Sequence, residues 1–165
     1  MSDAINRTAR KNMKKIMFVC TGNVCRSPMG MFMLRYRLKQ LNLDTEYEVT
    51  SAGLLESTKG QDMHPKCRQE LEKAGIPFTV HAAHPLRLRE FLEMDYVLYM
   101  EKYQKIEIKR MMNGRHMEKV HRILDYTDSP SDLADPYYTL DFSKAYQDLA
   151  RGIDAFVDKE ILGRK

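Results

Sequence analysis

The chain has 165 residues, of which 43% are hydrophobic and 30% charged, so it can form one compact domain and is not of disordered composition. Residues 1–15 carry five basic side chains and one acidic one, which accounts for the whole formal charge of +4, so the rest is neutral and nucleic-acid binding is not expected. The chain shows no apolar run of membrane-spanning length and no signal-peptide pattern, so we expect a cytoplasmic protein without membrane partners.

The first half alternates strands with helices. A nearly continuous apolar run predicts a buried strand over residues 15–19. Ser27 is a good N-cap and Pro28 suits a first helical turn, so we expect a helix to begin there. Next we expect a second strand over residues 47–51 and then a second helix over 65–74, which ends at Gly75.

The second half repeats this alternation. We expect helices over residues 87–93, 101–112 and 141–162, strands over 96–100 and 120–124, and a loop over 125–138. This order predicts an α/β fold, a three-layer sandwich around a central four-stranded parallel sheet, with its reactive site at the carboxyl edge of the strands. We expect one domain over residues 14–165, preceded by a flexible basic arm over 1–13.

Three cysteines, Cys20, Cys25 and Cys67, are too few for a disulfide framework, and a reducing compartment fits them better. His81 and His84 are the only closely spaced histidines, and no cysteine lies near them in the sequence. We therefore expect neither a metal site nor a cofactor.

The segment from Cys20 to Ser27 (CTGNVCRS) joins the first strand to the first helix. A loop in that position can turn its backbone N–H groups inward and bind an anion, helped by the positive end of the helix. Gly22 and Asn23 tolerate the left-handed backbone angles that such a curl needs. The same field would favour the thiolate of Cys20, a strong nucleophile, while the guanidinium of Arg26 can grip two phosphoryl oxygens.

A cysteine that ends a buried strand is often only a small core residue, and the spacing C-x5-R occurs by chance in many proteins. The buried strand before Cys20, the Gly22-Asn23 bend and the Ser27-Pro28 helix start together favour a phosphate-binding, nucleophilic loop. Such a loop needs a catalytic partner elsewhere in the chain.

The stretch from Val19 to Met29 resembles the signature of the low-molecular-weight protein tyrosine phosphatase family, which would make the chain a phosphoric monoester hydrolase. The resemblance implies a general acid in an Asp-Pro-Tyr motif near the C-terminus, and the run Asp135-Pro136-Tyr137-Tyr138 stands where that motif belongs. Ser51-Ala52-Gly53, after the second strand, also matches the family. The similarity covers roughly residues 14–163.

The resemblance implies that Cys20 attacks phosphorus to form a phosphocysteine, that Arg26 and the loop amides bind phosphate, and that Asp135 protonates the leaving phenolate. It also implies supporting roles around these groups: Ser27 bonds the sulfur of Cys20, Asn23 holds the loop partly through Ser51, and two tyrosines form a wall of the aromatic slot. The expected substrate contacts are Thr21, Gly22, Asn23, Val24, Cys25, Ser27, Tyr137 and Tyr138. The expected partners are phosphotyrosine proteins, with phosphate or another oxyanion in the site.

In related proteins the two cysteines of the loop form a reversible disulfide that protects the nucleophile from over-oxidation. The resemblance therefore implies that Cys20 and Cys25 can pair here. The alternative is that Cys25 is an ordinary buried thiol.

Several positions depart from the family pattern. Gly30-Met31 stand where Ala-Glu is common, His84 stands where an arginine is common, and the loop from Leu54 to His64 lacks the tryptophan of many relatives. None of these belongs to the reacting groups, but they bear on substrate preference and rate.

Three rival functions remain to be weighed. Thioredoxin-linked arsenate reductases need a further cysteine pair, and no cysteine follows Cys67. Protein-arginine phosphatases carry threonine where this chain has Val24, and a branched apolar residue favours an aromatic ring, so phosphotyrosine is preferred. A phosphocysteine carrier or non-catalytic phosphate-binding module would need neither Arg26 nor Asp135.

Overall fold

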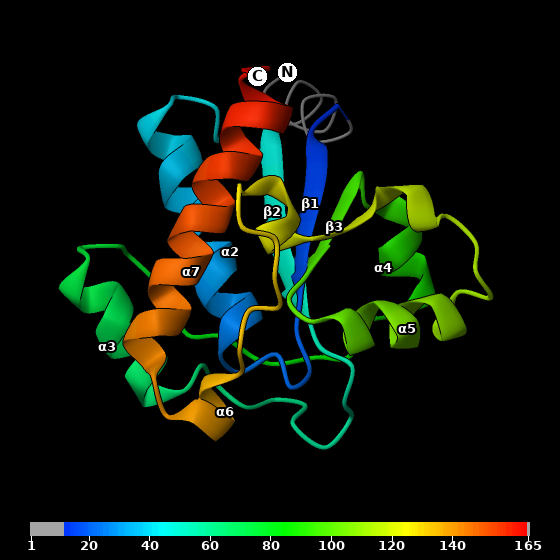
Figure 1. Cartoon of the computed structure of the whole chain (residues 1–165), viewed down its shortest axis with the longest axis horizontal. Helices are drawn as coiled ribbons and strands as arrows, with labels where there is room; N and C mark the ends of the chain where they lie inside the picture. The colour runs from blue at the N-terminus through cyan, green and yellow to red at the C-terminus, as the bar shows by residue number, and fades with distance from the viewer. Residues whose placement is uncertain (1–11, 165) are drawn as a thin grey trace, which may run out of the picture.

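The structure is a computed structural model that describes residues 12–164. Four parallel strands form its sheet in the order β2-β1-β3-β4: β1 (Lys14–Val19), β2 (Tyr47–Ala52), β3 (Tyr96–Tyr99) and β4 (Val120–Arg122). Helices cover both faces of this sheet, which confirms the predicted three-layer α/β fold (Figure 1). Residues 1–11 of the predicted basic arm lie outside the described residues.

The central strand β1 sends alternate side chains to two separate cores. Ile16 and Phe18 are fully buried among residues of α2 (Arg26–Gln40), α3 (Pro65–Lys73) and α7 (Phe142–Phe156). Met17 and Val19 are fully buried on the other face, with residues of α4 (Leu88–Glu93) and α5 (Lys102–Met111). Because both faces are covered, the strand reads as the continuous apolar run seen in the sequence.

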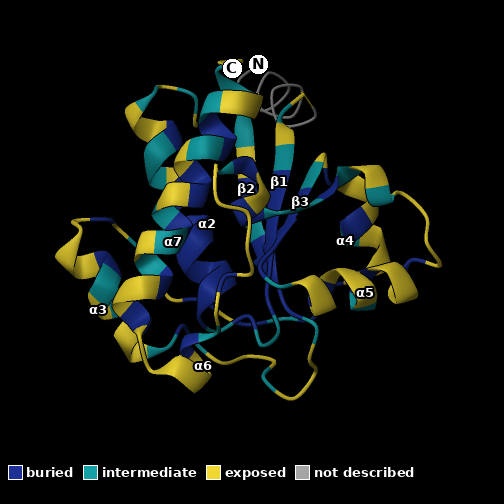
Figure 2. Ribbon diagram, viewed as in Figure 1, coloured by how far each residue is buried: buried dark blue, intermediate teal, exposed yellow. Residues whose placement is uncertain are grey.

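The amphipathic pattern of the last helix is also confirmed. Buried residues of α7 face the sheet side of the molecule while its other face is exposed (Figure 2). Asp141 caps the helix by accepting a hydrogen bond of 2.9 Å from the backbone N–H of Lys144. The helix continues through one π-helical turn, Val157–Ile161.

The structure corrects three details of the predicted elements. Ser27 is not the N-cap of the first helix, because α2 begins at Arg26 with Cys25 as N-cap, and the Ser27 hydroxyl bonds other partners. The last strand ends at Arg122 and is followed by a 3₁₀ turn, Ile123–Tyr126, and the predicted loop contains the four-residue helix α6 (Pro136–Thr139).

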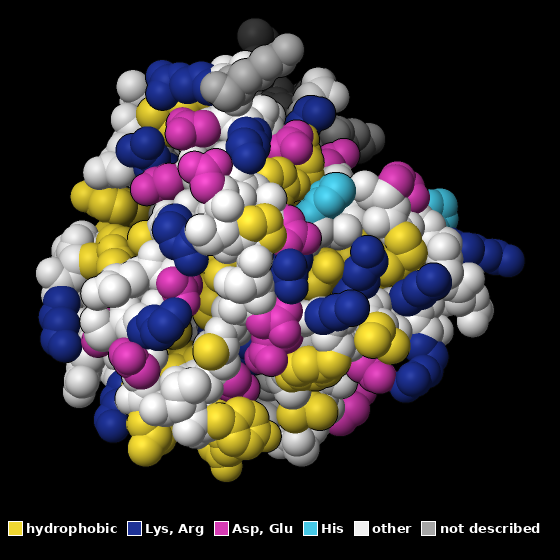
Figure 3. All heavy atoms as spheres, in the orientation of Figure 1, with side chains coloured by type: hydrophobic (Ala, Val, Ile, Leu, Met, Phe, Trp, Pro, Cys, Tyr) yellow, Lys and Arg dark blue, Asp and Glu magenta, His cyan; other side chains and the backbone are white. Residues whose placement is uncertain are grey.

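The surface carries charges of both signs. On the face shown in Figure 3, Lys and Arg side chains are interspersed with Asp and Glu, and hydrophobic side chains gather at the lower edge near α6. None of the helices within residues 12–164 is long and apolar enough to cross a membrane.

Candidate active site

The loop between β1 and α2 lies at the carboxyl edge of the sheet, where the fold places reactive groups. Asn23 has the left-handed backbone angle expected of it, with φ of 56°. Gly22 does not, because glycines with positive φ in the described chain are found only elsewhere. A side chain at Gly22 would meet Thr58 and Val24 only at ordinary contact distance, so the bend depends on Asn23.

Asn23 is the buried centre of the loop. Its side-chain N–H groups donate to the hydroxyl of Ser27 at 2.8 Å and to that of Ser51 at 3.0 Å. Its side-chain oxygen accepts from the backbone N–H of His84 at 3.1 Å, and its backbone carbonyl lies 2.8 Å from Nε2 of His81. Burial lowers the pKa of His81, so its neutral ring donates to this carbonyl. These bonds join three distant segments around one side chain.

The end of β2 packs directly against the same loop. A Cβ atom placed on Gly53 would lie 2.9 Å from Cβ of Asn23, so only glycine allows this approach. The hydroxyl of Thr58 donates to the carbonyl of Gly22 at 2.7 Å. The Ser51-Ala52-Gly53 run is therefore a structural support of the loop.

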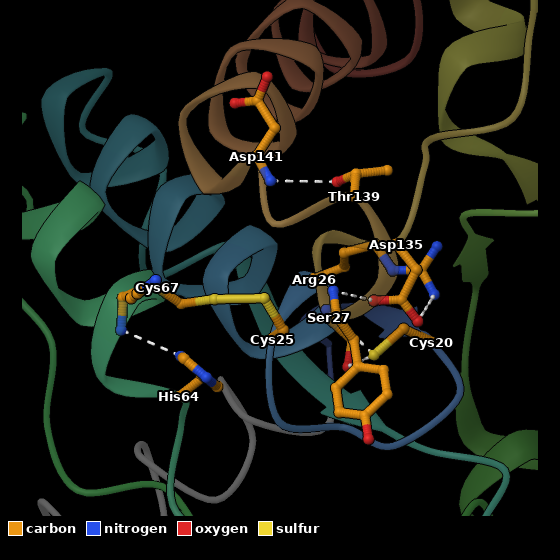
Figure 4. The surroundings of a disulfide bond; sticks show 11 residues. Cys20, Cys25, Arg26, Ser27, His64, Cys67, Asp135, Thr139 and Asp141 are labelled. Carbon is orange, nitrogen blue, oxygen red and sulfur yellow. Dashed lines mark hydrogen bonds and ion pairs between the residues drawn. A yellow bond between two sulfur atoms is a disulfide. The ribbon is translucent and has the colours of Figure 1, made fainter.

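Cys20 stands at the start of the loop with a free, buried thiol, 3% exposed. Its sulfur lies 2.9 Å from the hydroxyl of Ser27 and 3.4 Å from the backbone N–H of the same residue (Figure 4). These two groups can both donate to a sulfur anion. The expected contact between Ser27 and the sulfur is present.

Arg26 is 2% exposed and its guanidinium has protein partners on several sides. It donates to the carbonyl of Leu133 at 2.7 Å, forms a short ion pair with Glu101, and places Nη2 3.2 Å from Oδ2 of Asp135. Burial alone would lower the pKa of Arg26, but the charges of Cys20, Asp135 and Glu101 raise it overall. The guanidinium is thus held charged and in a fixed orientation beside the thiol.

Glu101 and the start of α5 form a part of the site that the sequence analysis missed. The buried side chain of Gln104 accepts from the backbone N–H groups of Met100 and Glu101 at 2.8 and 3.0 Å. It donates to the hydroxyl of Thr21 at 3.2 Å, and the hydroxyl of Tyr103 also contacts that of Thr21. Two side chains of α5 therefore hold the hydroxyl of Thr21 in place. The position of Glu101 two residues after the end of β3, at the reactive edge, was the available signal.

Asp135 comes from the other end of the chain. It has the extended backbone expected before proline, with φ of −78° and ψ of 115°, and caps α6 by accepting from the N–H of Tyr137 at 3.0 Å. The structure thus brings Cys20, Arg26 and Asp135 together, as the sequence predicts.

These groups open into one cavity of about 420 Å³. Its outer wall includes Tyr137 and Tyr138, which are 74% and 80% exposed and pack edge to face at 5.1 Å. Leu55, His64 and Phe142 also line it, and were not predicted. An apolar mouth above an anion-binding floor suits an aryl phosphate.

The structure changes the expected pairing of the cysteines. Cys25 forms a disulfide with Cys67 in the first turn of α3, not with Cys20, and the two Cα atoms lie 6.0 Å apart (Figure 4). Sequence spacing could not reveal this contact, since the two residues are 42 positions apart. Within residues 12–164, no group of three or more candidate ligands lies close enough to hold a metal ion.

Known proteins are similar to this chain in both sequence and fold. Residues 15–165 match the family described as low molecular weight phosphotyrosine protein phosphatase. The low molecular weight protein-tyrosine-phosphatase YfkJ of Bacillus subtilis is 28% identical over 153 residues, which cover 90% of this chain and 98% of that protein. PtpA of Staphylococcus aureus, strain RF122, is 30% identical over 88% of this chain and 93% of its own length.

Solved structures agree with these matches. The crystal structure of YfkJ superimposes with a TM-score of 0.88 at 26% identity and covers 93% of this chain and 98% of its own. The low molecular weight protein tyrosine phosphatase from T. tengcongensis gives a TM-score of 0.80 at 28% identity, with 88% and 99% covered.

Proposed function

The chain belongs to the low-molecular-weight phosphotyrosine protein phosphatase family and is a protein-tyrosine phosphatase, and on this premise we propose that Cys20 is its nucleophile, Arg26 its phosphate-binding residue and Asp135 its general acid. The observation that carries the proposal is the meeting of these three side chains in one cavity. We further propose that the catalytic domain spans residues 14–165.

In the first step the Cys20 thiolate attacks phosphorus and forms an S–P bond while the P–O bond to the tyrosyl oxygen breaks. The two donors of Ser27 support the idea that Cys20 is held as an anion before it reacts. Arg26 and the backbone N–H groups of the loop neutralise charge on the other phosphoryl oxygens.

Asp135 gives a proton to the departing phenolate, whose conjugate acid has a pKa near 10. A placed acid contributes about 10²–10⁴ to such a step. In the second step Asp135 takes a proton from water as the water attacks phosphorus, the S–P bond breaks, and Cys20 leaves as a thiolate. Phosphate is then released.

The proposed substrate class is phosphotyrosine in proteins. The isopropyl side chain of Val24 lines the cavity together with Tyr137 and Tyr138, an apolar set that suits an aromatic ring. Phosphoarginine is the second candidate because its phosphoryl group would bind to the same loop amides and Arg26. The side chain of Val24, however, offers no polar partner to the guanidinium of phosphoarginine.

The test measures initial rates on a phosphotyrosine peptide and a phosphoarginine peptide with the wild type and Cys20→Ser. We expect the wild type to hydrolyse phosphotyrosine and the variant not to. When the wild-type reaction is rapidly quenched, we expect the peptide that contains Cys20 to carry one phosphoryl group. Inorganic phosphate should still bind to the variant.

Turnover by Cys20→Ser would contradict the covalent mechanism. Preference for phosphoarginine would overturn the role given to Val24 while keeping the mechanism. Phosphate binding without turnover of either peptide by the wild type would instead indicate a phosphate-binding module.

A further inference from the structure

Cys67 is a cysteine outside the proposed reacting groups whose sulfur nonetheless contacts the loop between β1 and α2. It is fully buried in the first turn of α3 and bonded to Cys25, the last residue before α2. Cys20, Cys25 and Cys67 are all the cysteines of the chain. The disulfide therefore leaves the nucleophile as the single free thiol.

The position of Cys67 is fixed by the backbone as well as by the disulfide. His64, the N-cap of α3, donates its N–H to the carbonyl of Val24 in the loop at 2.7 Å. The N–H of Cys67 in turn donates to the carbonyl of His64 at 3.0 Å. These two bonds hold the first turn of α3 against the loop, so the fold presents the Cys67 thiol to Cys25 even when both are reduced.

The side chains of Cys20 and Cys25 have different partners. The sulfur of Cys20 is bonded to the hydroxyl and the N–H of Ser27 inside the cavity, while Cys25 extends towards α3 (Figure 4). A disulfide between Cys20 and Cys25 would have to give up both the contacts of Ser27 and the contact with Cys67.

We propose that Cys67 is the redox partner of Cys25, so that oxidation joins Cys25 to Cys67 and leaves Cys20 reduced and active. The proposal rests on the proposed role of Cys20 as nucleophile. With a peroxide as oxidant, the two thiols give up two electrons and two protons, one S–S bond forms, and the peroxide is reduced to two waters.

Cys67 also rescues Cys20 if the nucleophile is oxidised first. Peroxide converts the Cys20 thiolate to a sulfenic acid, and the Cys25 thiol condenses with it to form a disulfide and water. The Cys67 thiolate then attacks Sγ of Cys25, and the electron pair of the breaking bond leaves on the sulfur of Cys20. The last step is an exchange that needs no further oxidant, and it regenerates the nucleophile.

The experiment uses the full chain, fully reduced and then treated with hydrogen peroxide, as wild type, Cys67→Ala and the matched loop variant Cys25→Ala. Three quantities are followed: hydrolysis of an aryl phosphate, the number of free thiols, and the disulfide-linked peptides seen by mass spectrometry. Activity of each reduced protein, before peroxide, serves as the test of folding and of the proposed function.

In the oxidised wild type we expect at least half of the activity, one free thiol and a peptide that links Cys25 to Cys67. In Cys67→Ala we expect an activity loss of at least tenfold that a dithiol reductant reverses, with Cys20 linked to Cys25. In Cys25→Ala we expect a loss that the reductant does not fully reverse, because the Cys20 sulfenic acid then has no partner and oxidises further.

A Cys20–Cys25 peptide in the wild type, with the same loss as in Cys67→Ala, would overturn the proposal. So would equal sensitivity of all three proteins to peroxide. An inactive reduced wild type would contradict the proposed function instead, and peptide mapping would still decide which cysteines pair.

Discussion

Nη2 of Arg26 lies 3.2 Å from Oδ2 of Asp135, so the proposed phosphate-binding group and the proposed general acid form an ion pair with each other. The carboxylate occupies a donor that a phosphoryl oxygen would use. We therefore expect a substrate phosphate to compete with Asp135 for Arg26, so that binding of the anion would free the proposed acid to approach the leaving oxygen.

Asp135→Asn should separate these two roles. We expect kcat on a phosphotyrosine peptide to fall by about 10²–10⁴, because the leaving phenolate loses its proton donor. The loss on an activated aryl phosphate such as p-nitrophenyl phosphate should be far smaller, since its leaving group needs little protonation. Equal losses on both substrates would contradict the general-acid role.

The same variant should bind inorganic phosphate several-fold more tightly, because a negative charge next to the anion and a competitor for Arg26 are both removed. Competitive inhibition by phosphate measures this change. Weaker inhibition would mean that Asp135 supports the anion site and does not compete with it.

Glu101→Gln tests whether the start of α5 orients the guanidinium of Arg26. We expect kcat/KM to fall about 10- to 150-fold, since loss of a charge-assisted hydrogen bond costs about 1.5–3 kcal/mol. Glu107→Gln is the matched control, because Glu107 lies on α5, of which Glu101 is the N-cap, and its ion-pair partner within residues 12–164 is the exposed Arg110. Similar losses in both variants would show a general effect of charge on α5.

Asn23 can be tested by separating its backbone angle from its hydrogen bonds. Asn23→Gly keeps the left-handed angle without strain but removes the bonds to Ser27 and Ser51, and we expect a large fall in kcat. Asn23→Ala adds backbone strain of about 1–2 kcal/mol, so it should unfold at lower urea concentration than the glycine variant. A glycine variant with full activity would show that the angle alone forms the loop.

His81 and His84 should give opposite pH dependences of stability. Burial lowers the pKa of His81 below its ordinary 6.5. As the pH falls through 6.5, the imidazole of His81 is therefore protonated more readily in the unfolded chain than in the folded one. The stabilising effect of its neutral ring is complete above about pH 6.5 and decreases as the pH falls. His81→Gln, which keeps an N–H donor, should make the unfolding free energy less sensitive to acid.

The hydrogen bond that the ring of His84 donates to the carboxylate of Glu90 raises the pKa of His84 against the effect of its burial. This pair stabilises the fold below about pH 6.5, and the contribution is lost as the pH rises through the folded pKa. His84→Gln should therefore make the protein more sensitive to acid. Urea unfolding at pH 5, 6, 7 and 8 distinguishes the two variants, and a shift in the same direction for both would contradict the assignment.

The sequence predicts the architecture well because its signals are local. The apolar run of β1, the amphipathic period of α7 and the proline after Asp135 each act within a few residues. The loop motif and the Asp-Pro-Tyr motif are each short, contiguous runs of the sequence. The three proposed reacting groups could therefore be named from their resemblance to the family before the structure was known.

The missed features all depend on contacts between distant segments. Glu101 meets Arg26 and Cys67 meets Cys25 only because α5 and α3 pack beside the loop. Serine is a favoured N-cap residue, but the hydroxyl of Ser27 instead forms hydrogen bonds with the buried side chain of Asn23 and with the sulfur of Cys20. Local propensity is overruled where a tertiary partner competes for the same atom.

Arg26 is held by the backbone carbonyl of Leu133, 107 positions further along the chain. During synthesis the N-terminal part of a protein emerges from the ribosome first. The nascent chain therefore carries Cys20 and Arg26 long before it can fix the guanidinium or supply Asp135. A chain that stops before Leu133 lacks both the carbonyl that holds Arg26 and the proposed general acid, so we expect it to have no phosphatase activity.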